Sequence, residues 1–317
     1  MTDDPMSVNR RKALKTGGAL AAALAVDAVL PGLGHAATGA LQGKMVMVTG
    51  ASRGIGEAIA RRFAAEGATV ACLARTLDPG TGENTGSLKE VVAAIEKAGG
   101  KAIAVKCDVS DRDSRKAAVD EVLAKLGRVD ILVNNAAAAN LGTHFDELTA
   151  KQYTTTMELN LNGPFDFMQR LAPAMRTRGS GWILNISSSG AELSKGPPFN
   201  PLERNGLMMY GVSKAALNRM TVGMAAELQD TGVAVNALAP TSSVWTPGFV
   251  SSGVAKMSGR QGPGEQDEPM ESMAEAALAL CTVDGKTFTG KCLYSIKYLK
   301  EINRTVMTLD GKKPLKA

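Results

Sequence analysis

Residues 49–60 read TGASRGIGEAIA, and this stretch decides the fold. It follows the apolar run KMVMV at residues 44–48, which is typical of a buried strand, and it leads into a segment with the apolar spacing of a helix. Gly50, Gly54 and Gly56 therefore stand in a turn between strand and helix. Glycines there permit tight turning and let bare backbone approach a pyrophosphate at the helix N-terminus. The stretch predicts a dinucleotide-binding turn, with the spacing G-x-x-x-G-x-G in place of G-x-G-x-x-G.

Strand and helix signals continue to alternate after this turn. The strand-like runs are ATVACLAR, KAIAVKCDV, VDILVNNA, GWILNISS and VAVNALAP, and long helices are expected from Gln152 and from Tyr210. This order predicts a single-domain α/β protein with a doubly wound parallel sheet, the Rossmann fold, and ligands at the carboxyl ends of the strands. Residues 190–209 and 242–269 are rich in Gly, Pro, Ser and Met, so they are predicted to form loops over the active site.

Composition excludes several classes of protein. The 317 residues are 44% hydrophobic and 21% charged, as expected for a globular chain with a sizeable core. The net charge is +5, but Lys and Arg are scattered without a basic stripe, which argues against nucleic-acid binding. The cysteines lack CxxC spacing and histidines are few, so no metal site is expected. Four buried free thiols are predicted, at Cys72, Cys107, Cys281 and Cys292.

The first 36 residues form a separate unit. Arg10 and Arg11 precede an apolar, alanine-rich run that ends in the small residues GHAA, which is the layout of a signal peptide. NRRKALK resembles the twin-arginine export signal of bacteria, with Ala13 where that signal usually has phenylalanine. Residues 1–36 are therefore predicted to be a twin-arginine signal peptide and residues 37–317 the Rossmann domain, which places the protein in the periplasm. The alternatives are an amphipathic or disordered basic head and a cytoplasmic protein.

Five further motifs follow the glycine turn in a fixed order: CDV with Asp108, NNAA at 134–137, LNLNG at 159–163, ILNISSS at 183–189 and YGVSK at 210–214. Together they resemble the short-chain dehydrogenase/reductase family over nearly all of the chain after Gln42. Segments such as MAEAALALCTVDGKTFTG are similar to the hydroxysteroid dehydrogenase-like subgroup. The resemblance implies a small-molecule alcohol or carbonyl substrate and a homo-oligomer. No stable membrane anchor is expected, because the apolar run within residues 1–36 is too short and too alanine-rich for a spanning helix and is interrupted by Asp27.

Tyr210 and Lys214 are four residues apart and therefore share one face of a helix. A unit charge about 4 Å from the phenol, at an effective dielectric of about 20, is worth roughly 4 kcal/mol, so Lys214 is expected to lower the pKa of Tyr210 towards neutral. The family resemblance then implies that Tyr210 is the general acid/base, that Ser188 holds the substrate oxygen and that Asn160 serves a proton-relay water. The alternative is a nucleotide-binding sensor or interaction protein with little catalysis.

The coenzyme follows from charge at the end of the second strand. Ala74 stands where NAD-preferring members of the family have an acid, and Arg75 and Arg53 suit a 2′-phosphate, so NADP is favoured, with NAD as the alternative. The resemblance implies cofactor contacts at Gly50, Ser52, Arg53, Gly54, Ile55, Gly56, Arg75, Asp108, Val109, Asn135, Tyr210 and Lys214.

Two departures from the family pattern affect the substrate side. KGPPFNPLERNG, at residues 195–206, lengthens the interval between Ser188 and Tyr210. After Pro240 the chain has Thr241 in place of the usual glycine, and Thr246 lies one position later than the usual threonine. The contacts of this second loop are left open, and the first is expected to reshape the substrate pocket.

Overall fold

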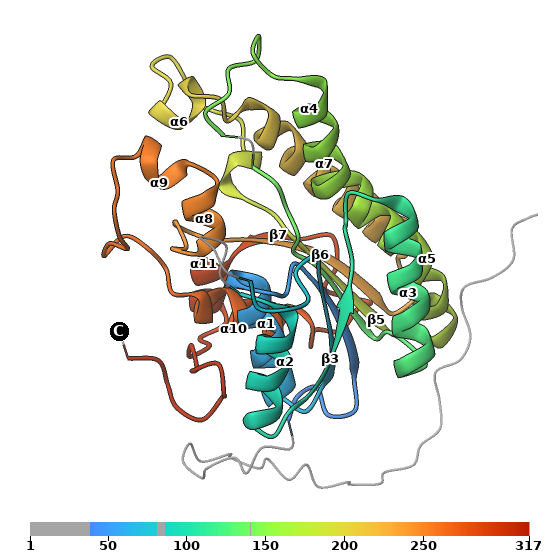
Figure 1. The fold of residues 1–317 in the computed structure, drawn as a ribbon. Helices are drawn as coiled ribbons and strands as arrows, with labels where there is room; N and C mark the ends of the chain where they lie inside the picture. The colour runs from blue at the N-terminus through green and yellow to red at the C-terminus, as the bar shows by residue number, and fades with distance from the viewer. Residues whose placement is uncertain (1–38, 81–85, 140, 317) are drawn as a thin grey trace, which may run out of the picture. The chain divides into compact units, whose positions relative to one another are not determined.

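A seven-stranded parallel sheet forms the centre of the protein in its computed structural model, which describes residues 39–80, 86–139 and 141–316 (Figure 1). The strand order is β3-β2-β1-β4-β5-β6-β7, with the order reversing between β1 and β4. The strands are β1 (Met45–Thr49), β2 (Thr69–Ala74), β3 (Lys101–Lys106), β4 (Ile131–Asn134), β5 (Gly181–Ile186), β6 (Val233–Ala239) and β7 (Cys292–Tyr294). The doubly wound α/β fold expected from the sequence is confirmed.

Helices cover both faces of the sheet and build a lobe above its carboxyl edge (Figure 1). The helices are α1 (Gly54–Ala65), α2 (Leu88–Lys97), α3 (Arg112–Leu126), α4 (Ala150–Met157), α5 (Gly163–Arg178), α6 (Pro201–Arg204), α7 (Met208–Glu227), α8 (Pro247–Ser251), α9 (Val254–Met257), α10 (Met270–Leu280) and α11 (Ser295–Glu301). Within the described ranges, none of them is both long and apolar enough to cross a bilayer.

Alternation along the strands divides the core into two layers. In β1, Val46 and Val48 pack with α1, α2 and α10, whereas Met47 points to the opposite layer, where α3, α5 and α7 pack. Successive side chains of a strand point to opposite faces, so a strand buried on both sides reads as a continuous apolar run. This is why KMVMV contains no polar residue between its apolar ones.

The helix expected from Gln152 is interrupted in the structure. It consists of α4, a five-residue π-turn η1 (Glu158–Asn162) and α5. The two loops predicted at residues 190–209 and 242–269 are also partly helical. They contain the short turn η2 (Ser189–Ala191) with α6, and α8 with α9, respectively.

Three of the four cysteines lie where the composition predicted. Cys72, Cys107 and Cys281 are buried free thiols, and burial raises the pKa of Cys107 to about 11. The prediction was wrong for Cys292, which is exposed. Cys292 begins β7, the edge strand, and an edge strand has a neighbour on one side only.

Candidate active site

The glycine turn lies between β1 and α1, and β4 holds it in place. The amide nitrogen Nδ2 of Asn135 donates to the carbonyl oxygens of Thr49 at 2.9 Å and Gly50 at 3.2 Å. Gly50 has φ +65°, a conformation that favours glycine. A Cβ on Gly56 would lie 2.3 Å from the Gly50 carbonyl oxygen and 2.4 Å from Asn135 Nδ2, so this position has room for glycine alone. The first turn of α1 therefore presents bare backbone.

Arg53 and Arg75 come from neighbouring strand ends. The backbone nitrogen of Ala51 donates to the carbonyl oxygen of Leu73 at 3.0 Å. Arg53 lies two residues after Ala51, and Arg75 lies two residues after Leu73. Arg75 is exposed and Arg53 is half-buried. Burial would raise the pKa of the Asp108 carboxyl, but hydrogen bonds from Ser110 and the charge of Arg75 lower it. The mouth of the turn therefore combines two guanidinium groups with an ionised carboxylate.

Asn160 lies inside the π-turn and is completely buried. Its Oδ1 accepts from the backbone nitrogen of Ala138 at 2.8 Å, and its Nδ2 donates to the Ala138 carbonyl oxygen at 2.8 Å and to Ser213 Oγ at 2.9 Å. Ser213 Oγ in turn donates to the backbone carbonyl of Tyr210 at 2.7 Å. Both amide hydrogens of Asn160 are thus engaged, and its side chain ties the segment after β4 to the start of α7.

Tyr210 and Lys214 lie on the first turns of α7, beside the carboxyl end of β5. Lys214 Nζ donates to the Ile186 carbonyl oxygen at 2.8 Å and lies 5.8 Å from the centre of the Tyr210 ring. The Tyr210 phenol shares a side-chain hydrogen bond with Ser188, whose Oγ also accepts from the backbone nitrogen of Gly190 at 3.1 Å. The structure therefore brings Ser188, Tyr210 and Lys214 together.

The serine that meets Tyr210 has two serine neighbours in the sequence. Ser187 is buried, and its hydroxyl has no hydrogen-bond partner within the described part of the chain. Ser189 is exposed at the start of η2. All three serines follow β5, which ends at Ile186, and Ser188 caps η2 from the position between the other two. Ser188 is the one whose side chain reaches the phenol.

The electrostatics of the pair differ from the expectation. Burial raises the pKa of Tyr210, and the hydrogen bond with Ser188 lowers it only in part. Burial also lowers the pKa of Lys214 to about 8. The expected lowering of the phenol pKa by Lys214 was therefore wrong for the free protein. That expectation assumed a fully charged neighbour at about 4 Å, whereas the ammonium is itself desolvated and binds a backbone carbonyl.

Thr246, whose contacts the sequence left open, lies against the glycine turn. Its Cβ is 3.3 Å from the place that a Cβ on Gly54 would occupy. Its Oγ1 accepts from the backbone nitrogen of Phe249 at 3.0 Å and so caps α8. The sequence does contain a threonine in this loop, but it lies one position later than in the family pattern, so its contact could not be predicted. The loop after β6 therefore meets the cofactor turn at this residue.

Glu268 holds the base of that loop and was missed by sequence reasoning. It is 3% exposed, and its carboxylate accepts from the backbone nitrogens of Thr241 at 2.8 Å and Ser242 at 3.3 Å and from Ser295 Oγ at 2.6 Å. Burial raises its pKa, although these donors act in the opposite direction. A glutamate in a Gly- and Pro-rich segment reads as a solvated charge, so nothing in the sequence indicated these contacts.

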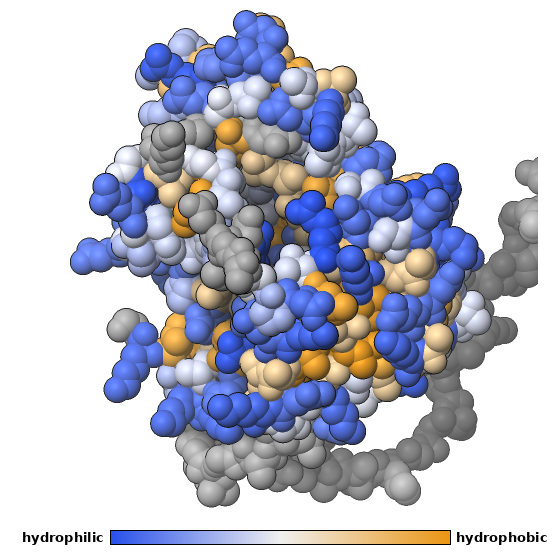
Figure 2. All heavy atoms as spheres, in the orientation of Figure 1, coloured by the Kyte–Doolittle hydropathy of each residue, from blue (hydrophilic) through white to orange (hydrophobic). Residues whose placement is uncertain are grey.

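Further along the same loop, Trp245 and Phe249 contact a cation. Their ring centres are 5.4 Å apart, and the Arg260 guanidinium carbon lies 5.0 Å from the first and 5.6 Å from the second. Asp267 binds the same guanidinium. Both aromatic side chains of this loop thus lie against Arg260. Figure 2 shows the face of the molecule hollowed between the upper lobe and the sheet.

A glycine turn at the switch point of a parallel sheet, with a serine, a tyrosine and a buried lysine beside it, defines a nucleotide-dependent oxidoreductase. Comparison with known proteins makes the class specific. The family model for short chain dehydrogenase matches residues 44–253, and the chain belongs to this family.

Among curated relatives, a short chain dehydrogenase of Pseudocercospora fijiensis is 40% identical over 205 residues, covering 64% of this chain and 61% of its own length. Hydroxysteroid dehydrogenase-like protein 2 of Homo sapiens is 34% identical over 268 residues, covering 83% of this chain and 59% of its own length. This chain therefore spans about three fifths of the length of these curated relatives.

Solved structures of the family match over more of their length. A metagenomic short-chain oxidoreductase in complex with NADP is 30% identical, with a TM-score of 0.64 over 80% of this chain and 97% of that one. A short chain dehydrogenase from Mycobacterium thermoresistibile is also 30% identical, with a TM-score of 0.71 over 87% of this chain and 94% of that one.

The buried lysine gives a prediction about stability. Lys214 binds its proton less tightly in the folded chain than in the unfolded chain. Between about pH 8 and pH 10.5 the unfolded state therefore holds more protons, so the free energy of unfolding increases with pH in this range. Wild type should therefore gain about 3 kcal/mol relative to Lys214→Met across this range. Urea denaturation of both proteins at several pH values measures the difference, and parallel pH profiles would contradict the low pKa.

Proposed function

We propose that the protein is an NADP-dependent oxidoreductase that interconverts an alcohol and a carbonyl. The observation that carries this proposal is the hydrogen-bonded pair of Ser188 and Tyr210 beside the buried Lys214, at the sheet edge where the glycine turn lies. A hydroxyl and a phenol that already share a hydrogen bond can both bind one substrate oxygen. A protein that only binds a nucleotide has no need of a desolvated lysine next to a phenol.

The glycine turn supports a bound dinucleotide. A Cβ on Gly56 would collide with Gly50 and Asn135, so the backbone there is kept bare, as close approach of a pyrophosphate requires. Asp108 and Val109 would border the adenine, and Thr246 would border the end of the cofactor nearest the substrate. NADP would supply the hydride acceptor for alcohol oxidation, and NADPH the donor for carbonyl reduction.

Each protein side chain then has a defined task. Ser188 binds and orients the substrate oxygen through its hydroxyl. Tyr210 gives a proton to this oxygen in reduction and removes it in oxidation. Lys214, whose pKa of about 8 leaves it mostly charged at pH 7, stabilises the phenolate when the proton has left. Asn160 positions this group through Ser213 and Ala138.

Removal of the phenol oxygen tests the proton step. Tyr210→Phe should lower kcat at least about 100-fold, since a positioned acid/base contributes about 10²–10⁴ in rate. The NADPH dissociation constant should change little, because the ring and its surroundings remain. Steady-state assays with a panel of alcohols and carbonyls, together with NADPH fluorescence titration, measure both quantities. Turnover close to wild type in the phenylalanine variant would refute the role of Tyr210.

Coenzyme preference rests on the two arginines at the mouth of the turn. Several solved relatives carry NADP, including a short chain dehydrogenase from Burkholderia cenocepacia, 31% identical with a TM-score of 0.64. Arg75 and Arg53 can bind a 2′-phosphate through charge-assisted hydrogen bonds. This contact is accessible to solvent, so binding of NADP should weaken as salt increases.

Arg75→Ala should weaken NADPH binding about tenfold and leave NADH binding almost unchanged, because only NADPH has the 2′-phosphate. Fluorescence titrations at low and high salt provide the measurement. Lys89→Ala is a suitable control, since it removes an exposed cation from α2 that already pairs with Asp78. An equal loss of affinity for both coenzymes would show that Arg75 supports the turn and does not select the phosphate.

We further propose that residues 1–36 direct export of the folded enzyme through Arg10 and Arg11. These residues lie outside the described ranges, so the proposal rests on the sequence. An enzyme that collects NADP in the cytoplasm has to fold around it before export, and the twin-arginine route is known for folded cargo. The same head would place the enzyme in the periplasm, with cysteines that need no disulfides.

Replacement of Arg10 and Arg11 by lysine tests export. The wild type should appear in the periplasmic fraction with a mature N-terminus near Ala37, and the double variant should stay in the cytoplasm with its head attached. Cell fractionation and mass spectrometry of the purified protein report location and cleavage together. Both proteins found uncleaved in the cytoplasm would rule out the export proposal.

The protein is also proposed to be a homo-oligomer. Support for self-association comes from a largely apolar groove of about 840 Å³ between α5 and α7, which a second copy of the chain would cover. Phe165, at 46% exposure, lies on its wall. Sedimentation of the purified protein measures the oligomeric state.

A further inference from the structure

Arg115 is a buried cation on α3, six residues after Val109. Its side chain is only 4% exposed. Its Nη1 donates to the carbonyl oxygen of Val109 at 2.7 Å and to Glu158 Oε2 at 3.0 Å, and its Nε donates to Asp166 Oδ2 at 3.0 Å. One guanidinium thus joins the segment after β3, the first residue of the π-turn and the first turns of α5.

The charges around Arg115 balance. Arg170 donates from Nε to Asp166 Oδ1 at 3.1 Å, so two arginines face the two carboxylates of Glu158 and Asp166. Burial would raise the pKa of Asp166, but hydrogen bonds from Arg170 and Arg115 lower it. Asp166 therefore stays ionised at neutral pH. A buried charge that loses its partner is strongly destabilised, so these groups hold one another in fixed positions.

Two of the three segments joined by Arg115 adjoin the proposed site. A Cβ on Gly163 would lie 2.5 Å from Val109 Cγ1, so the start of α5 packs directly on the wall expected to border the adenine. Glu158 also accepts from Asn162 Nδ2 at 2.8 Å, which closes the π-turn through its own side chains. Asn160 lies inside this turn.

We propose that Arg115 is a positioning residue for the reaction. It fixes the π-turn relative to the wall that would border the adenine. Asn160, inside this turn, donates to Ser213, and Ser213 donates to the backbone carbonyl of Tyr210, so the position of the π-turn affects the position of Tyr210. The inference rests on the proposed function, because it treats Tyr210 as the group that moves the proton. A π-turn inserts an extra residue into a helix and is frequently found at functional sites. Here Arg115 supplies the contact that holds its first residue.

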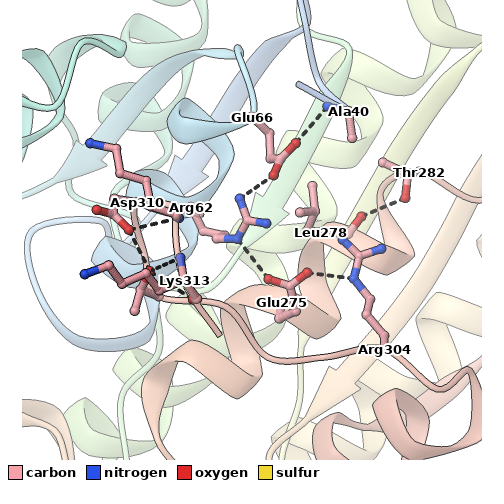
Figure 3. Close-up of polar contacts among 11 residues, drawn as sticks. Ala40, Arg62, Glu66, Glu275, Leu278, Thr282, Arg304, Asp310 and Lys313 are labelled. Atoms are coloured by element: carbon pink, nitrogen blue, oxygen red, sulfur yellow. Dashed lines mark hydrogen bonds and ion pairs between the residues drawn. The ribbon is translucent and has the colours of Figure 1, made fainter. Parts of the chain in front are cut away.

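A purely structural role is the competing explanation, and the chain contains a matched control. Arg62 on α1 is also 4% exposed and also binds two carboxylates, Glu66 and Glu275. Figure 3 shows this guanidinium between the two acids, with Arg304 on the other side of Glu275. This cluster connects α1, α10 and the C-terminal segment, and it touches none of the proposed site residues.

The first experiment compares hydrogen exchange in the free full-length variants Arg115→Gln and Arg62→Gln. Both should melt at lower temperature than wild type, because each loses a buried guanidinium. Only Arg115→Gln should accelerate exchange in residues 136–139 and 158–163. Equal exchange of these segments in both variants would overturn the proposal. Glu158→Gln, which removes a carboxylate that is 28% exposed, tests the same contact with less loss of stability.

The second experiment measures turnover per folded molecule and NADPH affinity. Arg115→Gln should lower kcat about tenfold and raise the NADPH dissociation constant by a similar factor, since small displacements of catalytic groups are costly. The KM of the substrate should change little, and Arg62→Gln should leave all three values near wild type. Faster exchange without loss of kcat would refute a positioning role. If the wild type binds no NADPH, the proposed function is wrong. The exchange experiment uses the free protein, so its result does not depend on NADPH binding.

Discussion

Parallel pairing of β1, β4 and β5 is the constraint on which the site depends. Because these strands run in the same direction, the glycine turn, the Asn135 segment and Ser188 all emerge at one edge of the sheet. The order reverses between β1 and β4, so the loops after these strands lead to opposite faces and leave space between them. Asn135 bridges this point by binding the carbonyls of Thr49 and Gly50. The glycine turn and the side chains proposed to be catalytic are thereby fixed to the same sheet.

Local patterns in the sequence were sufficient for the sheet, the turn and the tyrosine–lysine pair. Apolar runs identify strands that are buried on both faces, and a spacing of four places Tyr210 and Lys214 on one helix face. The π-turn could not be predicted in this way, because it depends on contacts of Glu158 and Asn160 with residues more than 20 positions away. The direction of the Tyr210 pKa depends on burial, which the spacing does not contain.

Buried charges have different consequences in different parts of this protein. Arg62 and Arg115 are each paired with two carboxylates, whereas the ammonium of Lys214 has the neutral carbonyl of Ile186 as its hydrogen-bond acceptor. Carboxylate partners offset the desolvation of a buried guanidinium, whereas burial lowers the pKa of an ammonium that binds a neutral carbonyl. The low pKa of Lys214 therefore reflects burial that lowers the free energy of unfolding. Lys214 lies beside the phenol whose charge it is proposed to stabilise. The arginine clusters hold elements in place instead.

The proposed catalytic residues are buried, whereas the loops that would contact the substrate are exposed. Asn160 and Lys214 are at most 2% exposed and are held by the sheet and α7. By contrast, Phe145 is 76% and Leu193 is 93% exposed on the loops of the upper lobe. Residues in these loops pack on few neighbours, so they can change without disturbing the buried group. Glu268 fixes the base of one such loop while Thr246 still reaches the glycine turn, so variation in the loop can alter the pocket without moving the cofactor contact.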